Sequence, residues 1–353
     1  SKSSVNKLPL LNKSLKLLFE SLNGEDRVAI VAYAGAAGLV LPSTKVSDTE
    51  TILDALDSIE SGGSTAGGAG IKLAYKIAKE NLVEGGNNRV ILATDGDFNV
   101  GVSSSADLVR LIEEKRKDDI YLTICGFGMG NYKDGHMEQI SNAGNGNYFY
   151  IDNIKEAKKV FSEEMRANMF TIAKDVKIQI EFNPNTVKAY RLIGYENRVL
   201  KDEEFNDDLK DAGELGAGHS VTALYEIIPA DSNEEVPTHD PLKYQKVTTQ
   251  NTNNKSDLFT IKFRYKKPSE SKSILITEVV GNQKKAFDKT SDNFRFSAAV
   301  AGYGLILRDS KYKGTATYNM VKSMAESALG EDPHDYRQEF ISMIETTELL
   351  AKK

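Results

Sequence analysis

Two short stretches of the sequence combine oxygen-bearing side chains with strand ends or glycines. Residues 90–93 are apolar and partly β-branched, which predicts a buried strand over residues 90–94, and Asp95 and Asp97 come directly after it. Residues 62–70 read G-G-S-T-A-G-G-A-G, so Thr65 lies in a flexible loop before a predicted helix. Open α/β sheets bind ligands at the carboxyl ends of their strands. Oxygen donors without a neighbouring Cys or His suit a hard cation such as Mg²⁺.

Each of these stretches also has a simpler interpretation. A hydroxyl before a helix is a common N-cap, so Thr65 alone does not define a metal site, and Asp97 could cap a loop. Residues 126–130, G-F-G-M-G, invite a phosphate-binding interpretation, but the next predicted helix is several residues away. Zinc catalysis lacks support because the histidines are scattered and no H-E-x-x-H motif occurs. The four histidines of the sequence are His136, His219, His239 and His334.

The elements that must position these residues alternate between helix and strand up to about residue 170, which predicts a parallel sheet. The expected strands cover residues 27–34, 39–42, 90–94, 120–127 and 147–151, and the expected helices cover residues 10–22, 50–59, 70–82, 106–116, 136–142 and 155–170. The turn before the last of these strands contains Gly146, which we expect to adopt a positive φ.

The pattern then changes character. Residues 176–182, V-K-I-Q-I-E-F, alternate in polarity, and similar stretches at 187–193, 220–228, 259–265 and 273–280 predict antiparallel strands of a sandwich. From residue 293 onward the pattern is helical, with helices expected over 294–307, 318–328 and 336–351. We therefore expect three domains: 1–170, a β-rich region at 171–292, and a helical region at 293–353.

Bulk composition narrows the functional classes. Hydrophobic residues make up 40% and charged residues 27% of 353 residues, which is ordinary for a soluble globular protein. The net charge of −6 argues against a nucleic-acid partner. No apolar run is long enough to span a membrane. Cys125 is the single cysteine and lies in an apolar run, so we interpret it as a buried structural thiol.

The motifs make the chain resemble a von Willebrand factor type A domain with its metal-ion-dependent adhesion site, and more narrowly the bacterial YfbK-like group. In that family the site comprises D-x-S-x-S, a distant Thr and a distant Asp. Residues 63–65, G-S-T, match the Thr element, and residues 94–96, T-D-G, match the Asp element. Residues 6–11, N-K-L-P-L-L, resemble the family's first helix, and residues 293–308 and 330–340 resemble its C-terminal region. The resemblance implies a Rossmann-like α/β domain with helices on both faces of a mostly parallel sheet.

The beginning of the chain departs from the family pattern. A buried central strand and D-x-S-x-S normally stand before the N-K-L-P-L-L segment, whereas here only residues 1–5 do. We therefore expect a fragment of a longer protein, with two strand edges left without a ladder partner. The resemblance places Ser1 at the last Ser of the motif, beside Thr65 and Asp95, and ranks Asp97 as a secondary ligand. We expect metal affinity to be impaired.

The resemblance implies a non-enzymatic interaction module. Its cation, Mg²⁺ with Mn²⁺ or Ca²⁺ as substitutes, would accept a carboxylate from a partner protein. Two alternatives stay open. One is a subunit of an ATPase-coupled metal-insertion or remodelling complex, in which the ATPase is another chain because no Walker motif occurs here. The other is a Mg²⁺-dependent phosphatase using Asp95 and Asp97. Relatives in this group are often envelope-associated or lipid-anchored, so we expect a cell-envelope location.

Overall fold

The computed structural model of the chain describes residues 7–33, 38–59, 67–94, 105–127, 134–195, 199–210, 212–236 and 255–351. Two compact units are present. The first comprises Ser1–Lys177, Asp208–His219 and Tyr265–Ile274, and the second comprises Ile178–Asp207, Ser220–Arg264 and Leu275–Lys353.

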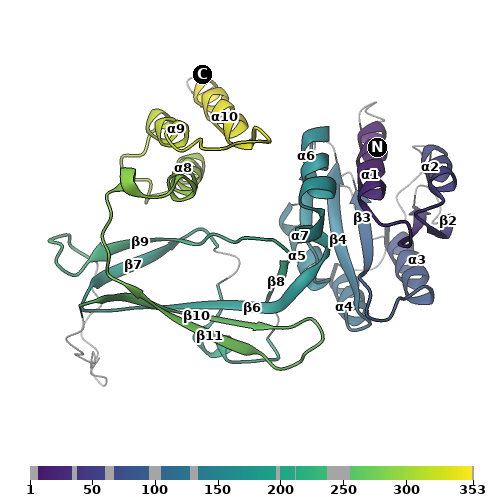
Figure 1. Ribbon diagram of the computed structural model, residues 1–353, viewed down its shortest axis with the longest axis horizontal. Coiled ribbons are helices and arrows are strands. Elements are labelled where there is room, and N and C mark those ends of the chain that lie inside the picture. The colour runs from purple at the N-terminus through teal and green to yellow at the C-terminus, as the bar shows by residue number, and fades with distance from the viewer. Residues whose placement is uncertain are drawn as a thin grey trace. The chain divides into compact units, whose positions relative to one another are not determined.

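The first unit contains the α/β domain, whose described strands form two separate sheets (Figure 1). Strand β1 (Arg27–Ala32) pairs antiparallel with β2 (Gly38–Lys45). Strands β3 (Asn88–Thr94), β4 (Ile120–Phe127) and β5 (Tyr148–Ile151) pair in parallel, in that order. Among the described strands, no ladder joins β1 to β3.

Helices cover both faces of the parallel sheet, as the resemblance implied. They are α1 (Lys7–Ser21), α2 (Thr49–Asp57), α3 (Gly67–Glu80), α4 (Ser105–Arg116), α5 (Asp134–Ala143), α6 (Ile154–Lys158) and α7 (Met165–Met169). Ile91 and Ala93 of β3 pack into a core with α1, α2 and α6. Val90 and Leu92 pack into a second core with α3, α4 and α5. Since side chains alternate across a strand, the two cores lie on opposite faces of the sheet.

Two local expectations were wrong. The helix predicted over 155–170 is divided, because a π-helical turn, Lys159–Glu163, separates α6 from α7. The Glu164 N–H donates a hydrogen bond to the Lys159 carbonyl at 2.8 Å, and this five-residue spacing identifies the turn as π-helical. In the turn before β5, Asn145 rather than Gly146 has the positive φ, 49°. A Cβ at Gly146 would lie 1.7 Å from the Leu122 carbonyl oxygen, so close backbone approach requires glycine there.

The chain continues into antiparallel strands, as the alternating pattern predicted. They are β6 (Thr171–Phe182), β7 (Val187–Ile193), β8 (Gly213–Gly216), β9 (Leu224–Pro229), β10 (Asp257–Lys266) and β11 (Ile274–Gly281). Four of them form a sheet in the order β11-β10-β6-β8, and β7 pairs with β9. The short strand β8 had no counterpart in the sequence analysis. Short 3-10 turns occur at Asp202–Phe205 and Phe287–Lys289.

Three helices close the chain: α8 (Asp292–Leu307), α9 (Tyr318–Glu326) and α10 (Tyr336–Ala351). Helices α8 and α9 begin at side-chain N-caps. The Ser291 side chain accepts a hydrogen bond from the Phe294 N–H, and the Thr317 side chain accepts one from the Met320 N–H. Their shared core comprises Ala299, Tyr303, Val321, Ala325, Ile341 and Ile344. Within the described ranges, no helix is both long enough and apolar enough to cross a bilayer.

Candidate metal site

The four predicted metal ligands, Ser1, Thr65, Asp95 and Asp97, lie outside the described residues. The structure does describe the elements next to three of them. Strand β3 ends at the buried Thr94, and helix α3 begins at Gly67.

Strands β3 and β4 end at the same edge of the sheet, because Thr94 pairs with Gly126 in a parallel register that starts at Asn88 and Ile120. This is the carboxyl edge, where open parallel sheets bind ligands. Asp95 follows Thr94 in the sequence and therefore continues from this edge.

Tyr33 connects the end of β3 with the first turns of α3. It follows β1, and its hydroxyl donates a hydrogen bond to the Ala93 carbonyl at 2.5 Å. On its other side it packs so closely on α3 that a Cβ at Gly70 would lie 2.6 Å from the Tyr33 Cβ. Thr65 stands five residues before Gly70, and Asp95 stands two residues after Ala93. In the sequence, the two predicted ligands are therefore close neighbours of the two elements that Tyr33 joins.

The glycines of α3 explain this close approach. Gly67, Gly68 and Gly70 are buried, and at these positions the helix presents no side chain to its neighbours. The sequence analysis did not single out Tyr33 or Gly70. The only sequence signal for this packing is the run of glycines, which also suits a flexible loop.

Across the ranges that the structure describes, no group of three His, Cys, Asp or Glu side chains is arranged to hold a metal ion. Cys125 is 1% exposed, and burial raises the pKa of its thiol to about 12. The thiol therefore stays neutral near physiological pH and makes a poor nucleophile or ligand.

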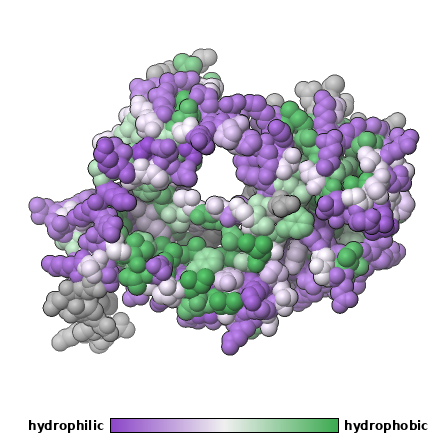
Figure 2. Space-filling model, viewed as in Figure 1, coloured by the Kyte–Doolittle hydropathy of each residue, from purple (hydrophilic) through white to green (hydrophobic). Residues whose placement is uncertain are grey.

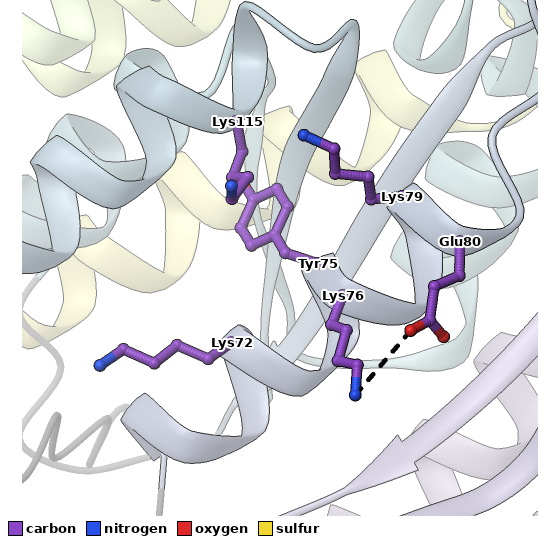
Figure 3. Close-up of a pocket in the computed structure, with 6 residues that line it drawn as sticks. All are labelled: Lys72, Tyr75, Lys76, Lys79, Glu80 and Lys115. Atoms are coloured by element: carbon purple, nitrogen blue, oxygen red, sulfur yellow. Dashed lines mark ion pairs between the residues drawn. The ribbon is translucent and has the colours of Figure 1, made fainter.

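A surface pocket of about 310 Å³ lies between α3 and α4 (Figure 3). Its lining residues are Lys72, Tyr75, Lys76, Lys79, Glu80 and Lys115. Figure 3 shows the ammonium groups of Lys72, Lys76 and Lys79 pointing in different directions. Lys76 pairs with Glu80 at 3.8 Å, and Lys79 pairs with Asp118 at 2.8 Å. Lys115 also lies 4.0 Å from the same Asp118 oxygen, so carboxylates of the protein already neutralise several of these cations, which does not favour an anion site.

Comparison with known proteins supports two successive modules. A family model described as von Willebrand factor type A domain matches residues 1–163. Another, described as Uncharacterized protein YfbK, C-terminal, matches residues 167–350. Uncharacterized protein YfbK of Escherichia coli (strain K12) is 43% identical over 343 residues, which are 97% of this chain and 59% of that protein. This chain thus spans less than two thirds of the length of that relative.

Solved structures include similar chains of low sequence identity. A von Willebrand factor type A protein from Catenulispora acidiphila has 15% identity and a TM-score of 0.47, over 96% of this chain and 77% of that chain. Proximal thread matrix protein 1 from the mussel byssus, described with a zinc-occupied MIDAS motif, has 18% identity and a TM-score of 0.37. That similarity covers 45% of this chain and 42% of the mussel chain.

The C-terminal family model spans just over half of this chain, and the type A model spans nearly all the remainder. The parallel sheet with helices on both faces agrees with the type A assignment. The chain therefore belongs to the YfbK family, in which a von Willebrand factor type A domain is followed by the YfbK C-terminal region.

Proposed function

We propose that this protein is a non-enzymatic interaction module that binds a partner protein through a divalent cation at the carboxyl edge of its type A domain. The observation that carries the proposal is the junction at Tyr33, which joins the end of β3 to the first turns of α3. Thr65 and Asp95 extend from these two elements. Their oxygens, with Ser1 and with Asp97 as a secondary donor, form a hard ligand set suited to Mg²⁺.

The chemistry of such a site suits recognition. A cation bound by few protein carboxylates keeps much of its charge, and a Glu or Asp of the partner can complete its coordination. The charge-assisted contact makes binding specific and dependent on the metal. The motif offers no nucleophile with a general base beside it, so we assign no catalytic residues.

Calorimetric titration with MgCl₂ and MnCl₂ tests the metal site. The titration is made on this chain and on the full-length polypeptide between its natural ends. We expect metal binding by the full-length protein and weaker binding, or none, by this chain. Asp95→Asn should abolish binding, whereas Asp107→Asn, on an exposed position of α4, should leave it unchanged. Absence of binding in both lengths would rule out a metal-bridged mechanism.

Partner binding and catalysis need separate measurements. Partner binding should disappear with EDTA and in Asp95→Asn. Hydrolysis of p-nitrophenyl phosphate that requires Mg²⁺ and Asp95 would instead favour the phosphatase alternative. We also propose a cell-envelope location for the natural protein, which fractionation of the native cells would test.

A further inference from the structure

Strand β11 forms an open edge of the four-stranded sheet (Figure 1). Among the described strands its only ladder neighbour is β10. The Asn282 N–H donates to the Ser256 carbonyl at 2.6 Å, which places the end of β11 beside the start of β10. On its other side, β11 presents a row of backbone N–H and C=O groups that can pair with another strand.

Most side chains of β11 are apolar, and apolar side chains are exposed on both faces of the sheet. Leu275, Ile276 and Val279 are 46%, 51% and 52% exposed. Because side chains alternate along a strand, Leu275 and Val279 share one face while Ile276 lies on the other. Natural edge strands are usually protected by charges, proline or bulges. Glu278 is the single charged residue between Ile274 and Gly281, so this edge has little such protection.

Among the described residues of the four strands of this sheet, Ala173 is the hydrophobic side chain that is buried. Figure 2 shows hydrophobic residues gathered over the strands of this sheet on the face in view. The clusters of buried hydrophobic residues in the described chain belong to the α/β domain and to the C-terminal helices.

The two antiparallel sheets meet through a small aromatic group around Phe182, which itself stays partly exposed. Its ring lies 4.3 Å from Tyr190, 5.4 Å from Tyr225 and 5.6 Å from Phe259, between ring centroids. A sheet with so little buried surface needs another layer or strand for stability.

We propose that a further β-strand of the same polypeptide, from outside these 353 residues, pairs with the edge of β11 that has no ladder partner among the described strands. Its side chains would be apolar on both faces, with a Lys or Arg opposite Glu278. The family has the length to supply it, since this chain spans 59% of the Escherichia coli relative. A second copy of this chain fits the edge less well. If β11 paired with β11 of another copy, the two Glu278 carboxylates would lie in the same short ladder and repel each other.

Hydrogen exchange measured on this chain and on the full-length polypeptide tests the pairing. In this chain, the β11 amides that point away from β10 should exchange rapidly. In the full-length protein, the same amides should be protected at least about tenfold more, as in a paired strand. Helix α10 serves as the internal reference and should exchange equally in both lengths.

The variant Val279→Lys adds a second measurement. In this chain it should change the melting temperature little, since the side chain is already exposed. In the full-length protein it should lower the melting temperature clearly. The control, Leu349→Lys on α10, alters a side chain that is 67% exposed and should have little effect in either length.

Three results would overturn the proposal. They are equal exchange of β11 in both lengths, equal effects of Val279→Lys in both lengths, and concentration-dependent protection of this chain with dimers in sedimentation. The last would identify a second copy as the occupant. None of these measurements involves the metal, so they are independent of the proposed function.

Discussion

Arg89, at the amino end of β3, donates a hydrogen bond from Nη2 to the carbonyl of Met169, the last residue of α7, at 3.2 Å. Its Nη1 donates to Thr123 Oγ1 at 2.7 Å, and Asn87 Nδ2 donates to the same Met169 carbonyl at 2.6 Å. Burial lowers the pKa of the Arg89 guanidinium. The start of the segment that follows α7 is thus anchored at the amino end of β3, the end opposite to Thr94, after which the predicted ligand Asp95 follows in the sequence.

This anchor predicts a stability cost for Arg89→Lys. Lysine cannot reach both acceptors with the geometry of a planar guanidinium, and an acceptor in a partly buried position would lose its charged donor. We expect a loss of about 1–3 kcal/mol in the free energy of unfolding, measured by urea denaturation. Arg110→Lys, whose side chain is 78% exposed on α4, should change it by less than about 0.5 kcal/mol. Equal effects would show that the anchor does not stabilise the fold.

The packing of Tyr33 on α3 predicts that Gly70→Ala is destabilising. The added Cβ would lie 2.6 Å from the Tyr33 Cβ, so the helix or the ring must move. Overpacking of this kind costs about 1–3 kcal/mol. Gly135→Ala, where a Cβ meets nothing within 4 Å, should be neutral within about 0.5 kcal/mol.

The same variant connects the packing to the proposed site. In the full-length protein, Gly70→Ala should also weaken Mg²⁺ binding in calorimetry, because Tyr33 would no longer hold α3 against β3. Unchanged affinity together with reduced stability would show that the Tyr33 junction does not position the metal ligands.

The elements with a strong local pattern were predicted well. The continuous apolar run of β4 and the alternation in β7 gave their bounds correctly, at residues 120–127 and 187–193. Strand β8 was missed because four residues bounded by glycines carry no measurable period. The contact between Tyr33 and Ala93 joins residues 60 apart, so no local pattern announces it. The predicted ligands Ser1, Thr65, Asp95 and Asp97 were assigned from the resemblance to the family motif, which requires no knowledge of the packing around them.

The need for glycine at position 146 also arises from a long-range contact that no local sequence pattern reveals. The role of Gly146 depends on the Leu122 carbonyl, 24 residues earlier in the sequence, and a Cβ would overlap that oxygen at 1.7 Å. Gly146→Ala should therefore cost about 3 kcal/mol or more in urea denaturation.

The neighbouring position serves as the comparison. Asn145→Gly should cost less than about 1 kcal/mol, since glycine accepts the positive φ of 49° while the bond from Arg116 to the Asn145 side chain is lost. If Gly146→Ala and Asn145→Gly lowered the free energy of unfolding equally, the close approach of Gly146 to the Leu122 carbonyl would not be the reason for the glycine.

Because the Cys125 thiol is buried, we expect the protein to lose stability at alkaline pH. Burial raises the pKa of its thiol from 9.0 to about 12, so between these values the unfolded chain ionises while the native chain does not. The unfolded state then binds fewer protons, and stability falls as the pH rises. The contribution is fully present below pH 9 and decreases by up to about 1.4 kcal/mol per pH unit above it.

Urea denaturation of the protein and of Cys125→Ala, at pH 7 and in steps from 9 to 10, measures this term. The variant should be less stable at pH 7, because removing the buried sulfur leaves a cavity. Its stability should fall less steeply above pH 9, because alanine does not ionise, so the difference between the two proteins should shrink as the pH rises. Burial also raises the pKa of Tyr75 from 10.0, so tyrosine ionisation acts in the same direction, mainly above pH 10, and equally in both proteins. Parallel pH dependences of the two proteins would mean that the thiol can ionise in the folded state, and that the core around Cys125 is accessible to water.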